Sequence, residues 1–467
     1  MKLRKLILFG LMLAFVFVIA VACSSTNSSE TSGTTNSNNN ESSSSDTGSS
    51  EAETVTLKFM YWGSVFEKQA VEQMVQAFEK QNPTIKIDAQ HVPTDYDTKI
   101  NTLMASGDLP DVAYLGEGLA LKWAEEGKVM DMTTYVEQHD QLRNRIPETF
   151  YYFDEGKTIG TNTAAEIMSL FYNKDLFESE NVALPPSSAD DAWTWSEFLE
   201  TAQKLTLDNK GNNALSSDFD SENIAQYGVS FPTGWTGWYP FLKSNGGNIT
   251  NEDGTEFALN SPEAVEIFQN LQDLMYKYHV APTPTQKENM PATSVVLQTK
   301  KVAMVIDGHW NILDFGESKL NFGVGVLPKY KEAKTAIFGA PTIIFSSTKH
   351  PEEAIKFYMF HNDPEQVDLF ARGLWMPLES KYYTDQEYID KWTKTDIHPP
   401  EFKEAVIDYT LSSAESGPSY SLKNFSEIDS AMNAVLDQLW LGQKSAQEVL
   451  EEMEQEIQPL LQGNYPR

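Results

Sequence analysis

A strand pattern, a helix pattern and a second strand pattern follow one another early in the chain, and this order constrains the fold more than any other feature of the sequence. Apolar and polar residues alternate at 55–59, which is typical of a half-buried strand. Apolar residues then recur at the spacing of one helix face at 71–78, and Asn82-Pro83 ends that pattern. A second alternating run occupies 85–89. The order predicts a βαβ unit and therefore a parallel sheet.

Aromatic and acidic side chains follow the strands of this expected sheet. Tyr61 and Trp62 end the first strand, and Glu117 comes just after a short buried strand expected at 112–115. In an open α/β sheet, the loops at the carboxyl ends of the strands line the ligand crevice. We therefore expect these three residues to contribute to a binding site. The alternative for Glu117 is a solvated loop carboxylate.

Another strand end carries a denser group of side chains. The apolar run 302–306 gives way to Asp307, Gly308, His309 and Trp310, which predicts a buried strand that ends in a turn. An acid, a histidine and an indole that meet there can recognise a polar ligand with a flat apolar face. The residues alone fit equally well a common Asp-Gly turn whose Trp is buried in the core.

Aromatic rings are densest in the segment 231–241, which contains Trp235 and Trp238. Its glycines and prolines exclude the interior of a long helix, so these rings are expected on a loop or at a helix start. Some of them will pack in the core, whereas exposed rings are good platforms for the faces of sugars. Trp235 is the first candidate for this role, and Trp238 is the second.

Length and charge limit the architecture and the partners. The 467 residues exceed what one hydrophobic core usually holds, which predicts two lobes or domains. The formal net charge of −32 excludes the basic surface that a nucleic-acid partner would require. Beyond the first 23 residues, Arg occurs only at Arg143, Arg145, Arg372 and Arg467, which argues against an anionic ligand such as a phosphate or carboxylate.

The N-terminal residues have the pattern of an export signal. Lys2, Arg4 and Lys5 precede an apolar run at 6–22, which predicts a signal peptide at 1–22. A run of about 17 residues is marginal for a transmembrane helix, although an uncleaved anchor is the alternative. Cys23 follows, and as the only cysteine it cannot form an internal disulfide or a cysteine-based metal cluster.

The residues around Cys23 suggest how the protein is attached to a membrane. Ala20-Val21-Ala22-Cys23 resembles a bacterial lipobox, with Ala20 where Leu is more usual. The resemblance implies that Cys23 is lipidated and becomes the mature N-terminus. Ser, Thr, Asn and Gly dominate the following residues, and no apolar residue precedes Ala52. We therefore expect 23–53 to be the lipidated Cys and a flexible tether, not a domain.

Four further segments resemble one family of proteins. They are the strand that runs into Gly308-His309-Trp310, the loop Ser106-Gly107-Asp108-Leu109-Pro110-Asp111, the segment Tyr172-Asn173-Lys174-Asp175 and the turn Phe338-Gly339-Ala340-Pro341. In combination they are similar to the extracellular solute-binding proteins of ABC importers, the family that includes the maltose-binding protein. The resemblance covers nearly the whole chain after residue 54.

This resemblance implies an α/β fold of the periplasmic-binding-protein-like type II. Two α/β lobes would enclose a ligand cleft, and about three crossings between them would form the hinge. We expect the crossings near 164–177, 338–341 and 372–377. The N-terminal lobe would comprise 54–164 and 340–374, and the C-terminal lobe 165–339 and 375–467.

The resemblance also implies roles for single residues. Trp310 would be the family's sugar-stacking Trp, Glu166 would contact sugar hydroxyls, and Trp235 and Trp238 lie where the family supplies stacking rings. A carboxylate suits a polyol because it accepts two hydroxyl hydrogen bonds. The expected ligand-binding set is completed by the neighbours of Trp310 and by one residue at each of the last two crossings: Asp307, His309, Gly339 and Trp375.

The expected function is that of a lipid-anchored binding protein on the extracellular face of a bacterial cell membrane. It would capture a neutral sugar or oligosaccharide by hinge closure and deliver it to the transmembrane permease of an ABC importer. We expect a monomer without cofactor or metal. A polyamine or another cation is the alternative ligand, since acidic and aromatic side chains also bind cations.

A secreted glycoside hydrolase and an adhesive or structural lipoprotein would also fit an exported, acidic chain. Two of the 67 acidic residues could act as a catalytic pair, but the sequence selects none. It contains no Gly-x-Ser-x-Gly elbow, no His-Glu-x-x-His motif and no Walker loop. Asp218, Asp220 and Glu222 have the spacing of EF-hand ligands, but Asn223 and Val229 occupy the required Gly and Glu positions, which excludes an EF-hand loop. We therefore expect a binding protein and not an enzyme.

Overall fold

The computed structural model describes residues 54–466. The predicted signal peptide, Cys23 and the tether lie outside the described residues. A search of 54–466 for a helix long and apolar enough to cross a membrane finds none.

The described chain begins in a four-stranded sheet with the order β12-β3-β1-β2. β1 (Val55–Tyr61) pairs in parallel with β2 (Ile85–His91) and β3 (Val112–Tyr114), and β12 (Thr342–Ile344) adds an antiparallel edge. α1 (Val65–Gln81) connects β1 to β2, so the predicted βαβ unit is confirmed. Because these strands are parallel, the carboxyl ends of β1 and β3 lie at the same edge of the sheet.

α1 begins at a capping box directly after β1. The hydroxyl of Ser64 accepts a hydrogen bond from the backbone N–H of Glu67, and the Glu67 carboxylate accepts one from the N–H of Ser64. Asn82 caps the other end of the helix. The tight connection places the first turn of α1, and with it Glu67, at the carboxyl end of β1.

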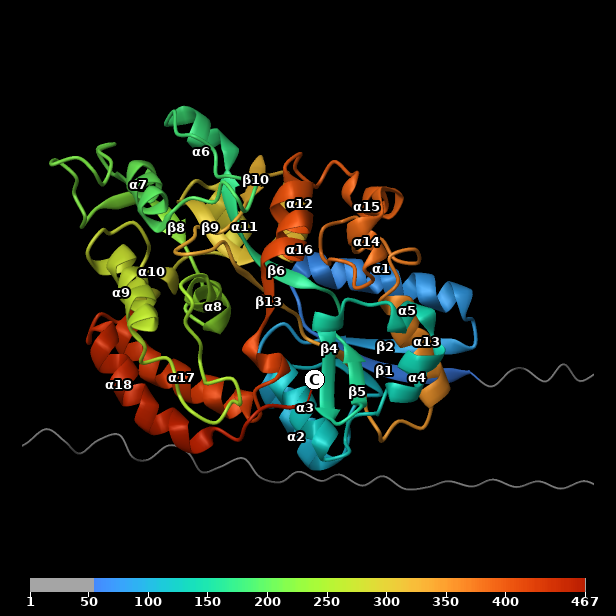
Figure 1. The fold of residues 1–467 in the computed structure, drawn as a ribbon. Coiled ribbons are helices and arrows are strands. Elements are labelled where there is room, and N and C mark those ends of the chain that lie inside the picture. The colour runs from blue at the N-terminus through green and yellow to red at the C-terminus, as the bar shows by residue number, and fades with distance from the viewer. Residues whose placement is uncertain (1–53, 467) are drawn as a thin grey trace, which may run out of the picture. The chain divides into compact units, whose positions relative to one another are not determined.

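Helices cover both faces of this sheet (Figure 1). Phe59 and Tyr61 pack in the same core cluster as residues of α1 and α13 (Pro351–His361). Met60 packs in another cluster, with residues of α2 (Tyr96–Ser106) and α3 (Glu117–Glu125). This alternation is the two-residue period of a strand, and it makes the sheet the middle of three layers.

The second sheet has the order β13-β11-β6-β9-β8-β7, and β10 also pairs with β6. The central β6 runs antiparallel to β9, β10 and β11, whereas β8 is parallel to β9. The strands are β6 (Glu166–Asn173), β7 (Leu207–Asp208), β8 (Ile224–Ser230), β9 (Val302–Gly308), β10 (Phe322–Gly325), β11 (Thr335–Phe338) and β13 (Ala414–Ser416).

This sheet is also covered on both faces. One face packs with α7 (Trp195–Leu205), α8 (Trp235–Ser244) and α9 (Pro262–Tyr276), and α17 (Phe425–Trp440) and α18 (Ala446–Ile457) extend that layer (Figure 1). The other face packs with α11 (Thr293–Gln298) and α12 (Asn311–Glu317). α7 and α18 each begin at a capping box, with Thr194 and Ser445 as the N-cap residues.

Shorter elements complete the described chain. They are α4 (Thr133–Gln138), α5 (Asp140–Arg143), β4 (Phe150–Asp154), β5 (Lys157–Thr161), α6 (Lys174–Ser179), α10 (Pro284–Lys287), α14 (Lys381–Thr384), α15 (Gln386–Thr393) and α16 (Tyr409–Ser413), with 3-10 turns at Pro147–Thr149, Pro418–Tyr420 and Gln458–Leu460 and a π-helical turn at Lys403–Asp408.

The chain passes between the two sheets where crossings were expected. β11 belongs to the second sheet and β12 to the first, and the turn at 339–341 joins them directly. The backbone N–H of Thr163 donates to the carbonyl of Ala340 at 2.8 Å, and the N–H of Ala165 donates to the carbonyl of Met376 at 3.1 Å. These bonds tie the three predicted crossings together. Gly339 has φ +145°, and a Cβ there would lie 2.5 Å from the carbonyl oxygen of Ala164, so only glycine fits.

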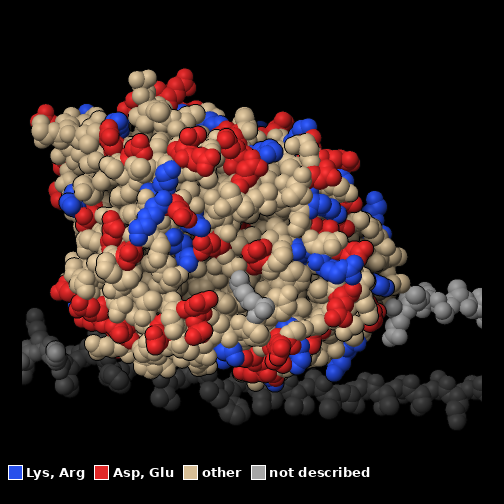
Figure 2. Space-filling model, in the orientation of Figure 1, with Lys and Arg blue, Asp and Glu red and all other residues tan. Residues whose placement is uncertain are grey.

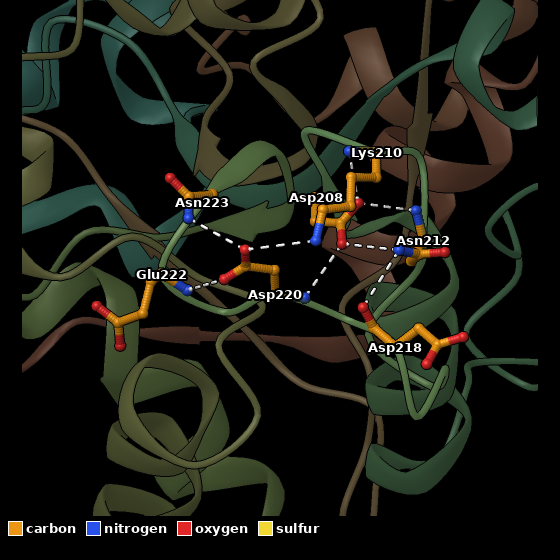
Figure 3. A network of polar contacts seen from close by, with 7 residues as sticks. All are labelled: Asp208, Lys210, Asn212, Asp218, Asp220, Glu222 and Asn223. Atoms are coloured by element: carbon orange, nitrogen blue, oxygen red, sulfur yellow. Dashed lines mark hydrogen bonds and ion pairs between the residues drawn. The ribbon is translucent and has the colours of Figure 1, made fainter.

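The acidic loop after β7 is held by its own hydrogen bonds (Figure 3). The Asp208 carboxylate accepts bonds from the backbone N–H groups of Lys210, Asn212 and Asp220 and from the Asn212 side chain. Burial raises the pKa of Asp208, but these hydrogen bonds outweigh it and lower the pKa to about 2. Asp220 caps the turn that follows, through Glu222 and Asn223. The loop is thus an internally satisfied connection between β7 and β8.

Candidate ligand-binding site

A cavity of about 680 Å³ is lined by residues of both sheets and of the crossings between them. Its size is within the range of small-molecule sites. The lining residues are Trp62, Gly63, Ser64, Glu67, Tyr114, Gly116, Glu117, Thr163, Ala164, Glu166, Trp235, Thr236, Ala292, Thr293, Asp307, Trp310, Asn311, Asp314, Phe338, Gly339, Ala340, Leu374 and Trp375.

Helix N-termini surround the cavity. The first turns of α1 and α3 follow the carboxyl ends of β1 and β3, and they bring Glu67 and Glu117 to the cavity wall. α8 begins there with Trp235, and α12 brings Asp314 in its first turn. Carboxylates are stabilised near helix N-termini by the unpaired N–H groups and the helix dipole. The fold therefore places acids and rings together at the point where the sheets meet the crossings.

Most of the residues predicted for ligand binding are brought together here. The residues that line the cavity are Trp62, Glu117, Glu166, Trp235, Asp307, Trp310, Gly339 and Trp375. They come from segments more than 200 positions apart in the chain. The sequence identifies the strand ends and crossings one by one, and the fold brings their side chains into one cavity.

Tyr61 lies in the core and does not line the cavity. Its ring is fully buried on the α1 side of the first sheet, where it stacks on Phe59 with a centroid distance of 5.2 Å. Trp62 is the next residue, and it packs edge-on against Tyr96 at 4.8 Å and lines the cavity. Strand alternation allows only one of two consecutive side chains to face the cavity, which corrects the expectation for Tyr61.

Trp238 and His309 are also placed in the core. Trp238 is 1% exposed and packs on Phe268 of α9 at 5.1 Å, because α8 continues as a helix past Pro240 and turns this ring inward. His309 is 1% exposed and packs on Phe402 at 5.6 Å. Burial lowers the pKa of His309 well below its ordinary value, so the ring is a neutral core imidazole. The expectation that they contact ligand is corrected by their burial.

Aromatic rings form one part of the cavity wall. Trp310 is 36% exposed, which makes it unusual among the large apolar side chains of the described residues. Phe338 supports it edge-on at 5.8 Å and contacts Trp235 in the same way at 5.5 Å. Trp62 and Trp375 complete the aromatic lining. Such rings offer flat apolar faces beside polar groups, which is the arrangement expected for a ligand with both kinds of surface.

Carboxylates form the polar part of the wall. Glu117 accepts a hydrogen bond from the N–H of Gly339 at 3.2 Å, and Asp307 accepts bonds from the Thr293 hydroxyl and the N–H of Gly308. Burial is the main cause that raises the pKa of both acids and of Glu166. It raises the pKa of Glu67 to about 8, and nearby Asp314 adds to that increase.

Two further acids of the wall, Glu67 and Asp314, were not expected from the sequence. Glu67 belongs to the capping box Ser64-x-x-Glu67 directly after the first strand, a local sequence signal that α7 and α18 also carry. Recognised here as well, it would have located the start of α1 at the expected site. Asp314 lies one helical turn after Trp310. Only the fold shows that Ser64 donates a hydrogen bond to it, at 2.9 Å.

Among the described residues, no Lys, Arg or His side chain lines the cavity. The wall therefore offers no positive partner to a phosphate or carboxylate, in agreement with the scarcity of Arg in the sequence. On the face shown in Figure 2, acidic and basic side chains are interspersed, and the described residues of that face form no continuous basic patch. On this face, the distribution of charge does not suit nucleic-acid binding.

Two further hollows adjoin the cavity. One of about 310 Å³, which Lys287 also lines, shares Thr236, Thr293, Asp307 and Trp310 with the cavity. Another of about 720 Å³ shares the segment 62–64 and Gly116. Trp310 therefore lies between the cavity and the first hollow, and Trp62 lies between the cavity and the second.

Two helix-covered sheets, hydrogen-bonded crossings and a cavity lined from both sheets define a ligand-binding protein of the two-lobed type II architecture. The family profile described as bacterial extracellular solute-binding protein matches residues 64–368. A match over this much of the chain shows membership: the protein belongs to the bacterial extracellular solute-binding protein family, and it is a binding component and not an enzyme. The resemblance seen in the sequence motifs is confirmed.

Individual relatives agree with this assignment. An ABC substrate-binding protein of Listeria monocytogenes, solved in complex with cycloalternan, superposes with a TM-score of 0.75 at 26% identity and covers 87% of this chain and 99% of its own. A maltose-bound MalE3 of Thermotoga maritima superposes with a TM-score of 0.72 at 19% identity, over 87% and 100%. The maltodextrin-binding protein MdxE of Bacillus subtilis is 25% identical over 326 residues, 64% of this chain and 70% of MdxE.

Proposed function

We propose that this protein captures a sugar or oligosaccharide in the cavity and delivers it to the permease of an ABC importer. The observation that carries the proposal is the cavity wall itself, in which Trp310, Trp62 and Trp235 lie beside carboxylates and the described residues supply no basic side chain. Rings stack on sugar faces, and carboxylates accept hydrogen bonds from sugar hydroxyls. The two adjoining hollows favour a ligand longer than one ring.

The crossings support hinge closure as the mechanism of capture. The cavity is lined by residues of both predicted lobes, 54–164 with 340–374 and 165–339 with 375–467, so a bound ligand would contact both. A ligand that contacts both lobes stabilises the closed form by its differential affinity, and the closed form would be recognised by the permease. The lobe boundaries and the ligand roles of single residues are part of this proposal.

A thermal-shift screen tests the ligand class. Neutral oligosaccharides, including maltose-series and branched glucans, are expected to raise the melting temperature, because a ligand that binds only the folded state stabilises it. Polyamines serve as the comparison, since the same acids and rings could hold a cation. Isothermal titration of each hit should show saturable binding without turnover. A melting temperature raised by polyamines alone would contradict the sugar assignment.

The membrane attachment is proposed from the sequence, because Cys23 lies outside the described residues. Lipidation of Cys23 would leave the segment up to residue 53 as a tether for the folded body. The substitution Cys23→Ser is expected to abolish lipid labelling and to release the protein from the membrane or to leave it unprocessed. The released body should melt at the temperature of the parent. Unchanged lipid labelling of the Ser variant would show that the anchor lies elsewhere.

A further inference from the structure

Three carboxylates and one hydroxyl belong to the same cavity wall, and we call Ser64, Glu67, Glu166 and Asp314 the acidic corner. Ser64 links two of them: its N–H donates to Glu67 at 3.3 Å and its hydroxyl donates to Asp314 at 2.9 Å. Burial raises the pKa of Glu166, and the charge of Glu67 adds to that increase. All four residues line the cavity.

Glu166 gives this corner an unused acceptor. The side chain is only 7% exposed, and it accepts a hydrogen bond from the backbone N–H of Trp310. Its second oxygen, Oε2, is buried and has no hydrogen-bond partner within 54–466. A buried carboxylate oxygen without a donor costs free energy, so the site is built for a donor that arrives from outside.

The charged groups around the acidic corner do not neutralise its negative charge. α1 contributes Glu67, α12 contributes Asp314 and, one turn on, Glu317, and β6 contributes Glu166. The nearby basic group is Arg372, which is already paired with Glu317 at 2.9 Å and bonded to Gln73. The other titratable neighbours are His91, whose Nε2 lies 2.9 Å from the carbonyl oxygen of Gly63, and the phenols of Tyr61, Tyr114 and Tyr383, whose pKa values are raised by burial and by Glu67 or Glu166. None of these described groups supplies a positive charge to the cavity.

We infer that the ligand carries a protonated amino group, as an amino sugar does, and that this group binds between Glu166, Glu67 and Asp314. The inference rests on the proposed sugar-binding function and narrows it to amine-bearing sugars. An ammonium group has three donors and no acceptor, so it suits a wall that offers several carboxylates. The Trp310 ring beside it can stack on the sugar and also attract the cation. A neutral hydroxyl could bond Glu166, but it would not stabilise the ionised forms of the other two acids.

Proton release follows from this arrangement. Burial and mutual repulsion favour the protonated acids in the empty corner, as the raised pKa of Glu67 shows. An ammonium ion stabilises their charged forms, so its binding must expel protons. A neutral sugar makes no such demand and should bind without proton exchange.

Matched sugar pairs test the inference. Glucosamine, galactosamine and the glucosamine disaccharide would be titrated calorimetrically at pH 6 against the mature protein, with glucose, galactose and cellobiose as the partners that carry a hydroxyl in place of the amine. We expect an amino member to bind at least tenfold more tightly than its hydroxyl partner. Its binding enthalpy should change with the ionisation enthalpy of the buffer, as release of protons requires. The binding enthalpy of the matched hydroxyl sugar should not change with the buffer.

Variants locate the effect. Asp314→Asn keeps an acceptor for Ser64 but removes the charge, and it should abolish the preference for the amino member. Glu72→Gln removes an equal charge from an ion pair of α1 outside the cavity lining, and it should leave the preference unchanged. Equal or tighter binding of the hydroxyl sugars would overturn the inference while the sugar-binding function stood. Binding of ring-free polyamines without any sugar would instead overturn the sugar assignment and leave amine recognition at the corner.

Discussion

Replacing Trp310 with Ala is expected to weaken ligand binding by about 1 to 3 kcal/mol, or roughly 5- to 150-fold, while the folded state keeps nearly all of its stability. The reason is the position of the ring. It is 36% exposed at the cavity wall, and it lies over Gly308, where an added Cβ would come within 2.0 Å of it. Removing the ring therefore removes surface that a ligand would bury, and little that the core uses.

Calorimetric titration of the parent and of Trp310→Ala, with a sugar found by the thermal-shift screen, measures this loss. Trp310→Phe is the matched control, because a smaller ring keeps part of the stacking surface and should recover part of the affinity. Urea unfolding of both variants should give midpoints close to that of the parent. A variant that binds as tightly as the parent but unfolds far earlier would place Trp310 in the core.

The architecture could be predicted because its signals are local. The βαβ order at the start and the crossing motifs each occupy one continuous stretch of the chain, and they are typical of their structures whatever packs around them. The family resemblance then supplied the long-range arrangement. What these signals cannot give is the direction in which one side chain points.

Neighbouring residues show this limit. Tyr61 and Trp62 both follow the first strand, yet only Trp62 reaches the cavity, because the pleat sends them to opposite faces. The same holds for the two residues after β9: His309 is buried, with 1% of it exposed, whereas Trp310 is 36% exposed. In each pair the sequence locates the strand end, whereas packing on α1 or against Phe402 decides which side chain is buried.

The acidic corner was beyond prediction for another reason. Ser64 and Asp314 are 250 positions apart, and each has an ordinary local role at the start of a helix. Their hydrogen bond exists because the first turn of α1 and the first turn of α12 meet across the cavity. A single sequence carries no signal for such a meeting, so an acid that helps to cap a helix could not be distinguished from one that also faces a ligand.

Trp238 offers the opposite case to Trp310, and its replacement by Ala is expected to destabilise the protein by about 3 to 5 kcal/mol. The ring is 1% exposed and packs on Phe268 at 5.1 Å, in the layer formed by α8 and α9. Truncation would leave a cavity that the surrounding helices can only partly close, and it would also remove the dispersion contacts of a large ring.

The measurement is equilibrium unfolding in urea, in which the midpoint of Trp238→Ala should fall sharply while the slope stays near that of the parent. Trp238→Phe should lose less, because it keeps most of the buried ring. At a temperature where Trp238→Ala is folded, its affinity for the sugar should stay within a few-fold of the parent, since the ring does not line the cavity. A stable Ala variant that had lost ligand binding would show that Trp238 contacts the ligand. The ligand-facing residues of α8 would then include Trp238 as well as Trp235.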